Sequence, residues 1–149
     1  MEKKLIVHEP EFPHIYIAGD NRGSTPKLLD AIKHGLETMS VPYTEKGLIP
    51  TPVLNHFVVN EKLNKTATLD AYVEKLANAY QEFMSLSTTV PRKYDRHLIV
   101  DCANGVGTFV MERLKLAMTD HINVHLINTD VSDPTKLNHY CGAEYVNQK

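Results

Sequence analysis

The chain has few cysteines and no long apolar run. Its 149 residues include only two cysteines, Cys102 and Cys141, which cannot build a disulfide framework. We therefore expect two reduced thiols and a cytoplasmic location. No apolar stretch approaches the ~18 residues that a membrane-spanning helix needs. The apolar part of Met1–Val7 is too short for a signal peptide, so we expect neither a membrane span nor a secretory leader.

An excess of charge of one sign is also missing. Sixteen Lys and Arg residues stand against 18 Asp and Glu, and the formal net charge is −2. Electrostatic binding to nucleic acid or to an acidic membrane needs a basic surface, so we expect neither partner. The 42% of apolar residues suffices for a core, and the length allows one ordinary domain or two small ones.

The first half of the chain predicts one strand and three helices. Residues 14–18 alternate in polarity and end in Gly19-Asp20, which indicates a strand and a turn. Ser24 is expected to cap a helix, with Pro26 in its first turn. Apolar residues then recur at helical spacing and predict one buried face: Leu28, Leu29, Ile32, Leu36 and Met39.

A break at Gly47–Pro52 should precede a short helix at residues 53–58, and the polar segment Asn60–Thr68 is predicted to be a loop. A long amphipathic helix follows at residues 69–84, with Asp70 near its positive N-terminal end. The Ser-, Thr- and Pro-containing segment at residues 85–96 lacks periodicity. We expect a domain boundary there, between residues 1–90 and 91–149.

The second half predicts a strand at His97–Asp101, a helix at Thr108–Met118 and a strand at Ile122–Asn128. This order favours a parallel pair with a right-handed crossover, and hence an α/β fold. The spacing of His121 and His125 could bind metal on a helix. On a strand both histidines should instead lie on the wetter face.

The turn Asp101–Gly107 stands between a predicted strand and helix and allows several interpretations. Its backbone N–H groups could bind an anion. It resembles the first motif of S-adenosylmethionine methyltransferases, with Asp130 placed to bind a ribose. It partly matches a dinucleotide fingerprint but lacks the third glycine. The structural interpretation is a tight turn in which glycines supply unusual backbone angles.

Four segments, in order, resemble the phosphoacetylglucosamine mutase family of the phosphohexomutase superfamily. Ile15–Leu28 is similar to a strand, a Gly-x-Asp-x-Arg-x-Ser turn and a helix, and Gly47–Pro52 to a Gly-Leu-x-Thr-Thr-Pro turn. Leu98–Thr108 and Lys136–Val146 resemble the opening of the second domain, and the latter favours the acetylglucosamine branch. The chain departs from the pattern at three positions, with Asn21 for Thr, Gly23 for Pro and Pro50 for Thr.

The resemblance implies layered α/β/α domains with mixed sheets, comprising the later part of the first domain and the start of the second. It implies an isomerase that interconverts N-acetylglucosamine 6-phosphate and 1-phosphate for UDP-N-acetylglucosamine synthesis, with Mg²⁺. The sequence nevertheless lacks the family's phosphoserine, metal, sugar and phosphate loops: no Ser precedes His-Asn and no Asp-x-Asp-x-Asp occurs. We expect no catalytic residue, no metal ligand and no cofactor in this chain, and sugar-phosphate binding only in a complete enzyme.

The resemblance also suggests roles for individual residues. Weak candidates for substrate contact are Thr51, Asn138 and His139, although Asn138 is expected mainly to organise its loop. Arg22 could bind phosphate, but an ion pair with Asp20 is favoured. The residues expected to shape turns are Gly19, Asp20, Arg22, Asp101, Asn104, Gly105 and Gly107.

Two alternatives remain open at this point. The chain could be a truncated paralogue that acts as a non-catalytic interaction protein, or a methyltransferase fragment. A partial domain should leave strand edges open to other chains. We expect marginal stability and self-association through the strands Ile15–Ala18, Leu98–Val100 and Val124–Ile127.

Overall fold

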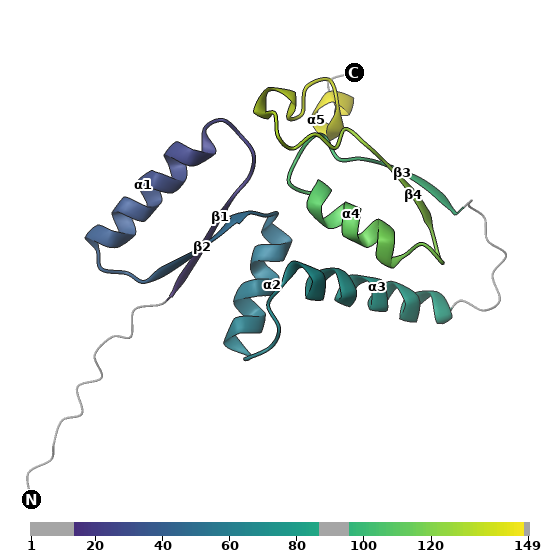
Figure 1. The fold of residues 1–149 in the computed structure, drawn as a ribbon, viewed down its shortest axis with the longest axis horizontal. Coiled ribbons are helices and arrows are strands. Elements are labelled where there is room, and N and C mark those ends of the chain that lie inside the picture. The colour runs from purple at the N-terminus through teal and green to yellow at the C-terminus, as the bar shows by residue number, and fades with distance from the viewer. Residues whose placement is uncertain (1–13, 87–95, 148–149) are drawn as a thin grey trace, which may run out of the picture.

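The computed structural model describes residues 14–86 and 96–147, which form two lobes joined by two helices (Figure 1). The first lobe contains β1 (Ile15–Gly19), α1 (Thr25–Thr38) and β2 (Tyr43–Leu48). The joining helices are α2 (Thr51–Lys62) and α3 (Leu69–Ser85). The second lobe contains β3 (His97–Asp101), α4 (Thr108–Ala117), β4 (Asn123–Ile127), the 3₁₀ turn η1 (Pro134–Lys136) and α5 (Gly142–Asn147).

Each lobe is built on a pair of parallel strands. β1 pairs with β2 from Ile15 opposite Tyr43, with an irregularity between Ile17 and Gly19. β3 pairs with β4 without interruption from His97 opposite Asn123. The α/β class and the parallel pairing of the last two strands are confirmed. The strand β2 was missed, because its charged residues and Gly47 obscure the alternation of apolar and polar residues. Its extended structure depends on pairing with β1.

Helix α1 begins where the sequence predicts, but two of its expected features are wrong. Pro26 lies in the first turn, whereas the Ser24 side chain makes no capping hydrogen bond. Of the predicted apolar face only Leu29 is buried, while Leu28 is 60% and Met39 68% exposed. A sheet of two strands is too narrow to cover a whole helical face, so the outer part of the stripe stays in contact with solvent.

Helix α2 is longer than predicted, because Asn60 and its neighbours continue it to Lys62. The Asn60 amide lies 2.8 Å from the His56 ring and donates to the Thr66 carbonyl at 3.0 Å. These contacts connect the end of α2 to the loop before α3. The Thr68 hydroxyl then accepts from the Ala71 N–H at 3.2 Å and caps α3, with Asp70 in the first turn as expected.

The core combines residues from both halves of the chain. Val53 and Phe57 of α2 pack with Val73 of α3 and Val110 of α4, and α3 lies along α4 (Figure 1). The domain boundary predicted at residues 85–96 falls largely outside the described residues and stays a prediction. This shared core orients the second lobe relative to α2 and the first lobe.

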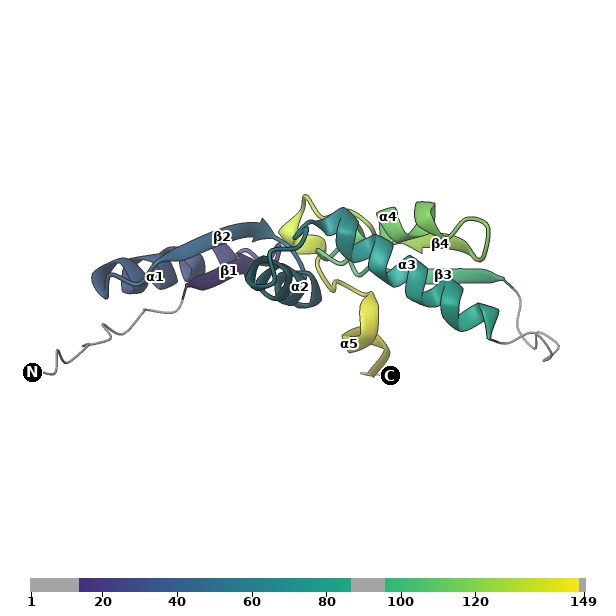
Figure 2. The same ribbon diagram turned by 90° about the horizontal axis from the view of Figure 1, so that it is seen from below.

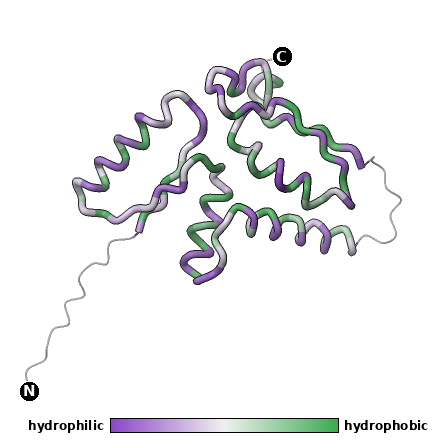
Figure 3. Tube along the Cα trace, in the orientation of Figure 1, coloured by the Kyte–Doolittle hydropathy of each residue, from purple (hydrophilic) through white to green (hydrophobic). Residues whose placement is uncertain are grey.

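The described part of the chain is thin (Figure 2), and many of its large apolar side chains are exposed. Apolar residues follow β3 and β4 (Figure 3), yet Ile99 is 68% and Leu98 45% exposed. None of the described helices is long and apolar enough to cross a membrane. The three strands expected to be open to other chains are present, but only β3 is mainly exposed. In β4 Val124 is buried, and β1 has no exposed residue, which corrects the expectation for Ile15–Ala18.

Candidate functional site

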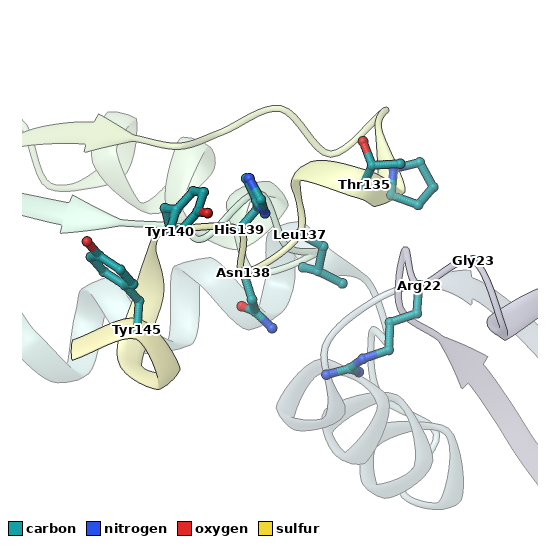
Figure 4. A pocket seen from close by; sticks show the side chains of 9 residues that line it. Arg22, Gly23, Thr135, Leu137, Asn138, His139, Tyr140 and Tyr145 are labelled. Carbon is teal, nitrogen blue, oxygen red and sulfur yellow. The ribbon is translucent and has the colours of Figure 1, made fainter. Parts of the chain in front are cut away.

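The carboxyl ends of the strands in both lobes lead to the junction between the lobes, where parallel α/β sheets usually bind ligands. One cavity of about 440 Å³ lies between Gly19, Thr51 and Val106. A second, of about 470 Å³, has Arg22 on one side and Asn138 and His139 on the other (Figure 4). The weak substrate candidates are therefore divided, with Thr51 in one cavity and Asn138 and His139 in another.

The first-lobe side of the junction is the turn after β1. The Thr25 hydroxyl donates to Asp20 at 2.7 Å, and the Arg22 guanidinium forms the predicted ion pair with Asp20. Burial opposes ionisation of Asp20, but these contacts and the Arg22 N–H outweigh it and lower the pKa of the carboxyl. A Cβ on Gly19 would lie 2.4 Å from Thr25 Cγ2, so glycine permits the close approach.

The turn after β3 corrects the expectation about its glycines. Positive φ falls on Ala103 (50°) and Asn104 (55°), while Gly107 has φ −59°. Four of the turn's N–H groups already have acceptors, and that of Cys102 donates to the Ile127 carbonyl at 3.0 Å. Ala103 donates to Asp101 Oδ1 at 2.9 Å, Asn104 to the Asn128 carbonyl at 2.7 Å and Gly105 to the Cys102 carbonyl at 2.9 Å. These N–H groups are thus occupied by carbonyl and carboxylate oxygens of the turn and of the end of β4, which favours the structural interpretation over an anion site.

Asn104 is the residue that connects the loops of the second lobe. Its side chain, in a residue only 7% exposed, donates to the Lys136 carbonyl at 3.0 Å and accepts from the Asp130 N–H at 2.9 Å. Asn at positive φ is tolerated far better than most residues. Asn104 is thus a predicted turn residue whose side chain joins two further loops of the second lobe.

Asp101 performs a similar task at the end of β3. Its carboxylate accepts from the Asn128 amide at 3.0 Å, from the Ala103 N–H at 2.9 Å and from the Gly142 N–H at 2.9 Å. The Asn128 contact is the leading cause of a lowered pKa. Gly142, which the sequence analysis missed, has φ +76° and joins α5 to this turn.

Asp130 and Asp133 do not form a metal site. Lys136 lies 2.5 Å from Asp130, whose pKa falls to about 2 through Lys136 first and Ser132 second. Asp133 accepts from the Thr135 hydroxyl at 2.6 Å. Across residues 14–86 and 96–147 no three His, Cys, Asp or Glu residues gather as ligands. The residues that are described therefore do not fit Mg²⁺, and Asp130 is not free to bind a ribose.

These carboxylates predict a loss of stability in acid. The pKa values of Asp20, Asp101 and Asp130 are all lowered in the folded chain, so the unfolded chain binds more protons as pH falls below about 4. The contribution of these carboxylates to the free energy of unfolding is complete above that pH and is lost as the pH falls towards 2. Buried His56, whose pKa is lowered by desolvation, adds a loss that begins below about pH 6.5.

Urea unfolding at a series of pH values measures this loss. Lys136→Met should make the slope below pH 4 shallower, because Asp130 then titrates closer to its unfolded pKa. An unchanged acid slope in that variant would contradict the assignment.

The loop around Asn138 forms the aromatic wall of the second cavity. The Asn138 N–H donates to the Ala103 carbonyl at 3.0 Å, and the residue has φ 58°. The His139 and Tyr140 ring centroids lie 4.2 Å apart, and those of Tyr140 and Tyr145 5.9 Å apart. The side chains of Asn138 and Arg22 project towards the same gap from opposite lobes (Figure 4). Tyr140 and Tyr145 also line this cavity and were missed, because no local pattern in the sequence relates them to Arg22.

The remaining predicted side chains lie away from the cavities. His125 is exposed on β4, and His121 lies before the strand, its ring centroid 6.1 Å from that of Tyr80. Cys102 and Cys141 are unpaired thiols, and burial raises the pKa of both. Burial therefore disfavours the thiolate, which is the reactive form of cysteine.

No family model matches the chain, but individual proteins do. The chain is 33% identical to phosphoacetylglucosamine mutase 1 of Schizosaccharomyces pombe, in a match that covers 92% of the chain and 27% of that protein. It is 31% identical to the phosphoacetylglucosamine mutase of Sus scrofa, covering 97% of the chain and 26% of that protein. The chain thus spans about a quarter of the length of the curated relatives it matches.

Solved structures agree in fold. The N-acetylphosphoglucosamine mutase of Aspergillus fumigatus, in complex with GlcNAc-6P and magnesium, has a TM-score of 0.76 and 28% identity, covering 95% of this chain and 29% of that one. An N-acetylglucosamine-phosphate mutase of the alpha-D-phosphohexomutase superfamily, in the apo-form, has a TM-score of 0.71 and 34% identity. The match covers 91% of this chain and 30% of that one.

Proposed function

Because this chain is related over nearly its whole length to the phosphoacetylglucosamine mutases of the alpha-D-phosphohexomutase superfamily, we propose that it forms the part of such an enzyme that joins two domains and frames a sugar-phosphate cleft. A complete enzyme of this kind would interconvert N-acetylglucosamine 6-phosphate and 1-phosphate, supplying UDP-N-acetylglucosamine synthesis in the cytoplasm. The chain by itself would be inactive.

The observation that carries this proposal is the cavity at the carboxyl ends of the strands. Arg22, Asn138 and His139 line it from two lobes, as a cleft between two domains requires. Phosphoryl transfer, however, depends on a positioned nucleophile and on cations that stabilise the developing charge. The 149 residues lack the family's Ser-His-Asn and Asp-x-Asp-x-Asp motifs, and the described acidic residues do not fit Mg²⁺.

We therefore expect no detectable mutase turnover from the purified chain. The assay supplies N-acetylglucosamine 6-phosphate, a bisphosphate primer and Mg²⁺, and couples the 1-phosphate product to nucleotide-sugar synthesis. The Schizosaccharomyces pombe relative is the positive control. Turnover that scales with this protein in independent purifications would refute the proposal of an inactive chain.

A second candidate function is that of a non-catalytic interaction protein, favoured by the uncovered apolar residues Leu98 and Ile99 of β3. We propose that such residues lead the isolated chain to self-associate, because exposed apolar strands invite pairing. Size-exclusion chromatography over a range of concentrations should show species larger than a monomer. Ile99→Lys, at a residue 68% exposed, should shift them towards monomer. Met39→Lys, at an equally exposed apolar residue after α1 in the other lobe, is the matched control. A concentration-independent monomer with one sharp thermal transition would argue against this proposal.

A further inference from the structure

Asn21 crosses the junction between the lobes. It lies in the turn after β1, yet its side-chain amide donates to the Asn104 carbonyl at 2.7 Å and to the Val131 carbonyl at 3.1 Å. Asn104 and Val131 follow β3 and β4, so a single amide contacts both strand ends of the second lobe. The residue is 6% exposed; its hydrogen bond to Asn104 is buried and that to Val131 is partly buried.

The chemistry of the side chain suits this double contact. A primary amide has two N–H donors, whereas the Thr found at this position in the resembling family has one hydroxyl hydrogen. Asn21 Oδ1 is buried without a hydrogen-bond partner among the described residues. The orientation that leaves Oδ1 unpaired is the one that directs both donors to carbonyl oxygens, because the reverse would bring three oxygens together.

Asn21 also stands between groups that line the cavities. Its neighbours Asp20 and Arg22 are held to each other by their ion pair, and Arg22 faces Asn138 and His139 across one cavity. On the other side of the contact, Asn104 connects the Asp130 and Lys136 loops. A displacement of Asn21 would therefore move Arg22 relative to the Asn138 loop.

We infer that Asn21 is a positioning residue that closes the junction between the lobes and sets the width of the cavity between Arg22 and Asn138. It acts through the backbone carbonyls of Asn104 and Val131 and has no part in chemistry. This role is specific to the Asn of this chain, because Thr could satisfy only one of the two carbonyls. The inference does not depend on the proposed mutase activity.

The direct test is hydrogen exchange of the Asn21 side-chain amide, followed by NMR in the unmodified chain. Both amide protons should exchange at least tenfold more slowly than those of Asn55, which is exposed on α2. Exchange of the Asn21 protons at the rate of Asn55 would overturn the inference. This measurement needs no variant and is unaffected by any folding defect that a substitution causes.

Variants test the positioning role. Asn21→Thr should speed exchange of the Asn104 and Asp130 backbone N–H groups at least tenfold and leave the β1–β2 N–H groups unchanged, whereas Asn55→Thr should change neither. Asn21→Asp should have a larger effect at pH 7, since its carboxylate would face two carbonyl oxygens. Equal acceleration throughout the chain would indicate general destabilisation and refute a role at the junction, as would no acceleration at all.

Discussion

Asn104→Ala should lower the free energy of unfolding by about 3 kcal/mol. The substitution removes the amide that joins the Asp130 N–H to the Lys136 carbonyl and leaves both backbone groups without their partner. A buried polar group that loses its hydrogen bond costs roughly 1–3 kcal/mol. Because the two partners lie on loops that form one side of the cavity, these loops should also become mobile.

Asn138→Ala is the matched control for this prediction. Asn104 and Asn138 share a left-handed backbone, with φ 55° and 58°, so each substitution costs about 1 kcal/mol for placing alanine there. Within the described residues the Asn138 side chain forms no hydrogen bond, and only its backbone N–H is bound. Urea unfolding of both variants should show the larger loss for Asn104→Ala. Equal losses would mean that backbone conformation, and not the side-chain contacts, stabilises these loops.

Gly142→Ala should be the second severe substitution, costing about 3 kcal/mol. Gly142 has φ +76°, and a Cβ there would lie 2.7 Å from the Cβ of Ala103. Relief of this overlap must move the backbone and weaken the bond from the Gly142 N–H to Asp101 at 2.9 Å. Overpacking of this kind typically costs about 1–3 kcal/mol, to which the positive φ adds about 1 kcal/mol.

Gly47→Ala separates these two contributions. Gly47 has φ +72°, and a Cβ there would meet nothing within 4 Å. Its replacement should therefore cost only about 1 kcal/mol, the conformational part of the penalty. The free energies of unfolding of Gly142→Ala and Gly47→Ala, measured by thermal and urea unfolding, should differ by the cost of the overlap with Ala103. Identical stabilities would show that the α5 loop shifts freely and that Gly142 is not closely packed.

Predictions from sequence succeeded where a signal is local. The alternation of residues 14–18 predicts the first strand, His97–Asp101 was also predicted as a strand, and the spacing of apolar residues at 69–84 predicts a long helix; the structure has β1, β3 and α3 there. The pairing of β3 with β4 followed from the order of the elements. The ion pair of Arg22 with Asp20 was also predicted correctly, because two residues of opposite charge in one tight turn lie within contact distance of each other.

Predictions failed where a distant segment decides the outcome. β2 depends on pairing with β1, and the exposure of Leu28 on α1 depends on how wide the sheet beneath it is. The left-handed angles fell on Ala103 and Asn104 because Asp101 and Asn128 bind their N–H groups. The importance of Asn21 was missed because its two acceptors lie 83 and 110 residues further along the chain.

The sequence by itself determined the α/β class, the main helices and strands, and the likeness to phosphoacetylglucosamine mutases, because periodicity and short motifs are properties of neighbouring residues. Only the tertiary structure decided which side chains meet at the junction. Asn21, Arg22, Asn104 and Asn138 come from turns that no local pattern relates to one another. Their distances follow from the packing of α2 and α3 against α4 and from the parallel pairing that brings both sets of strand ends to one place.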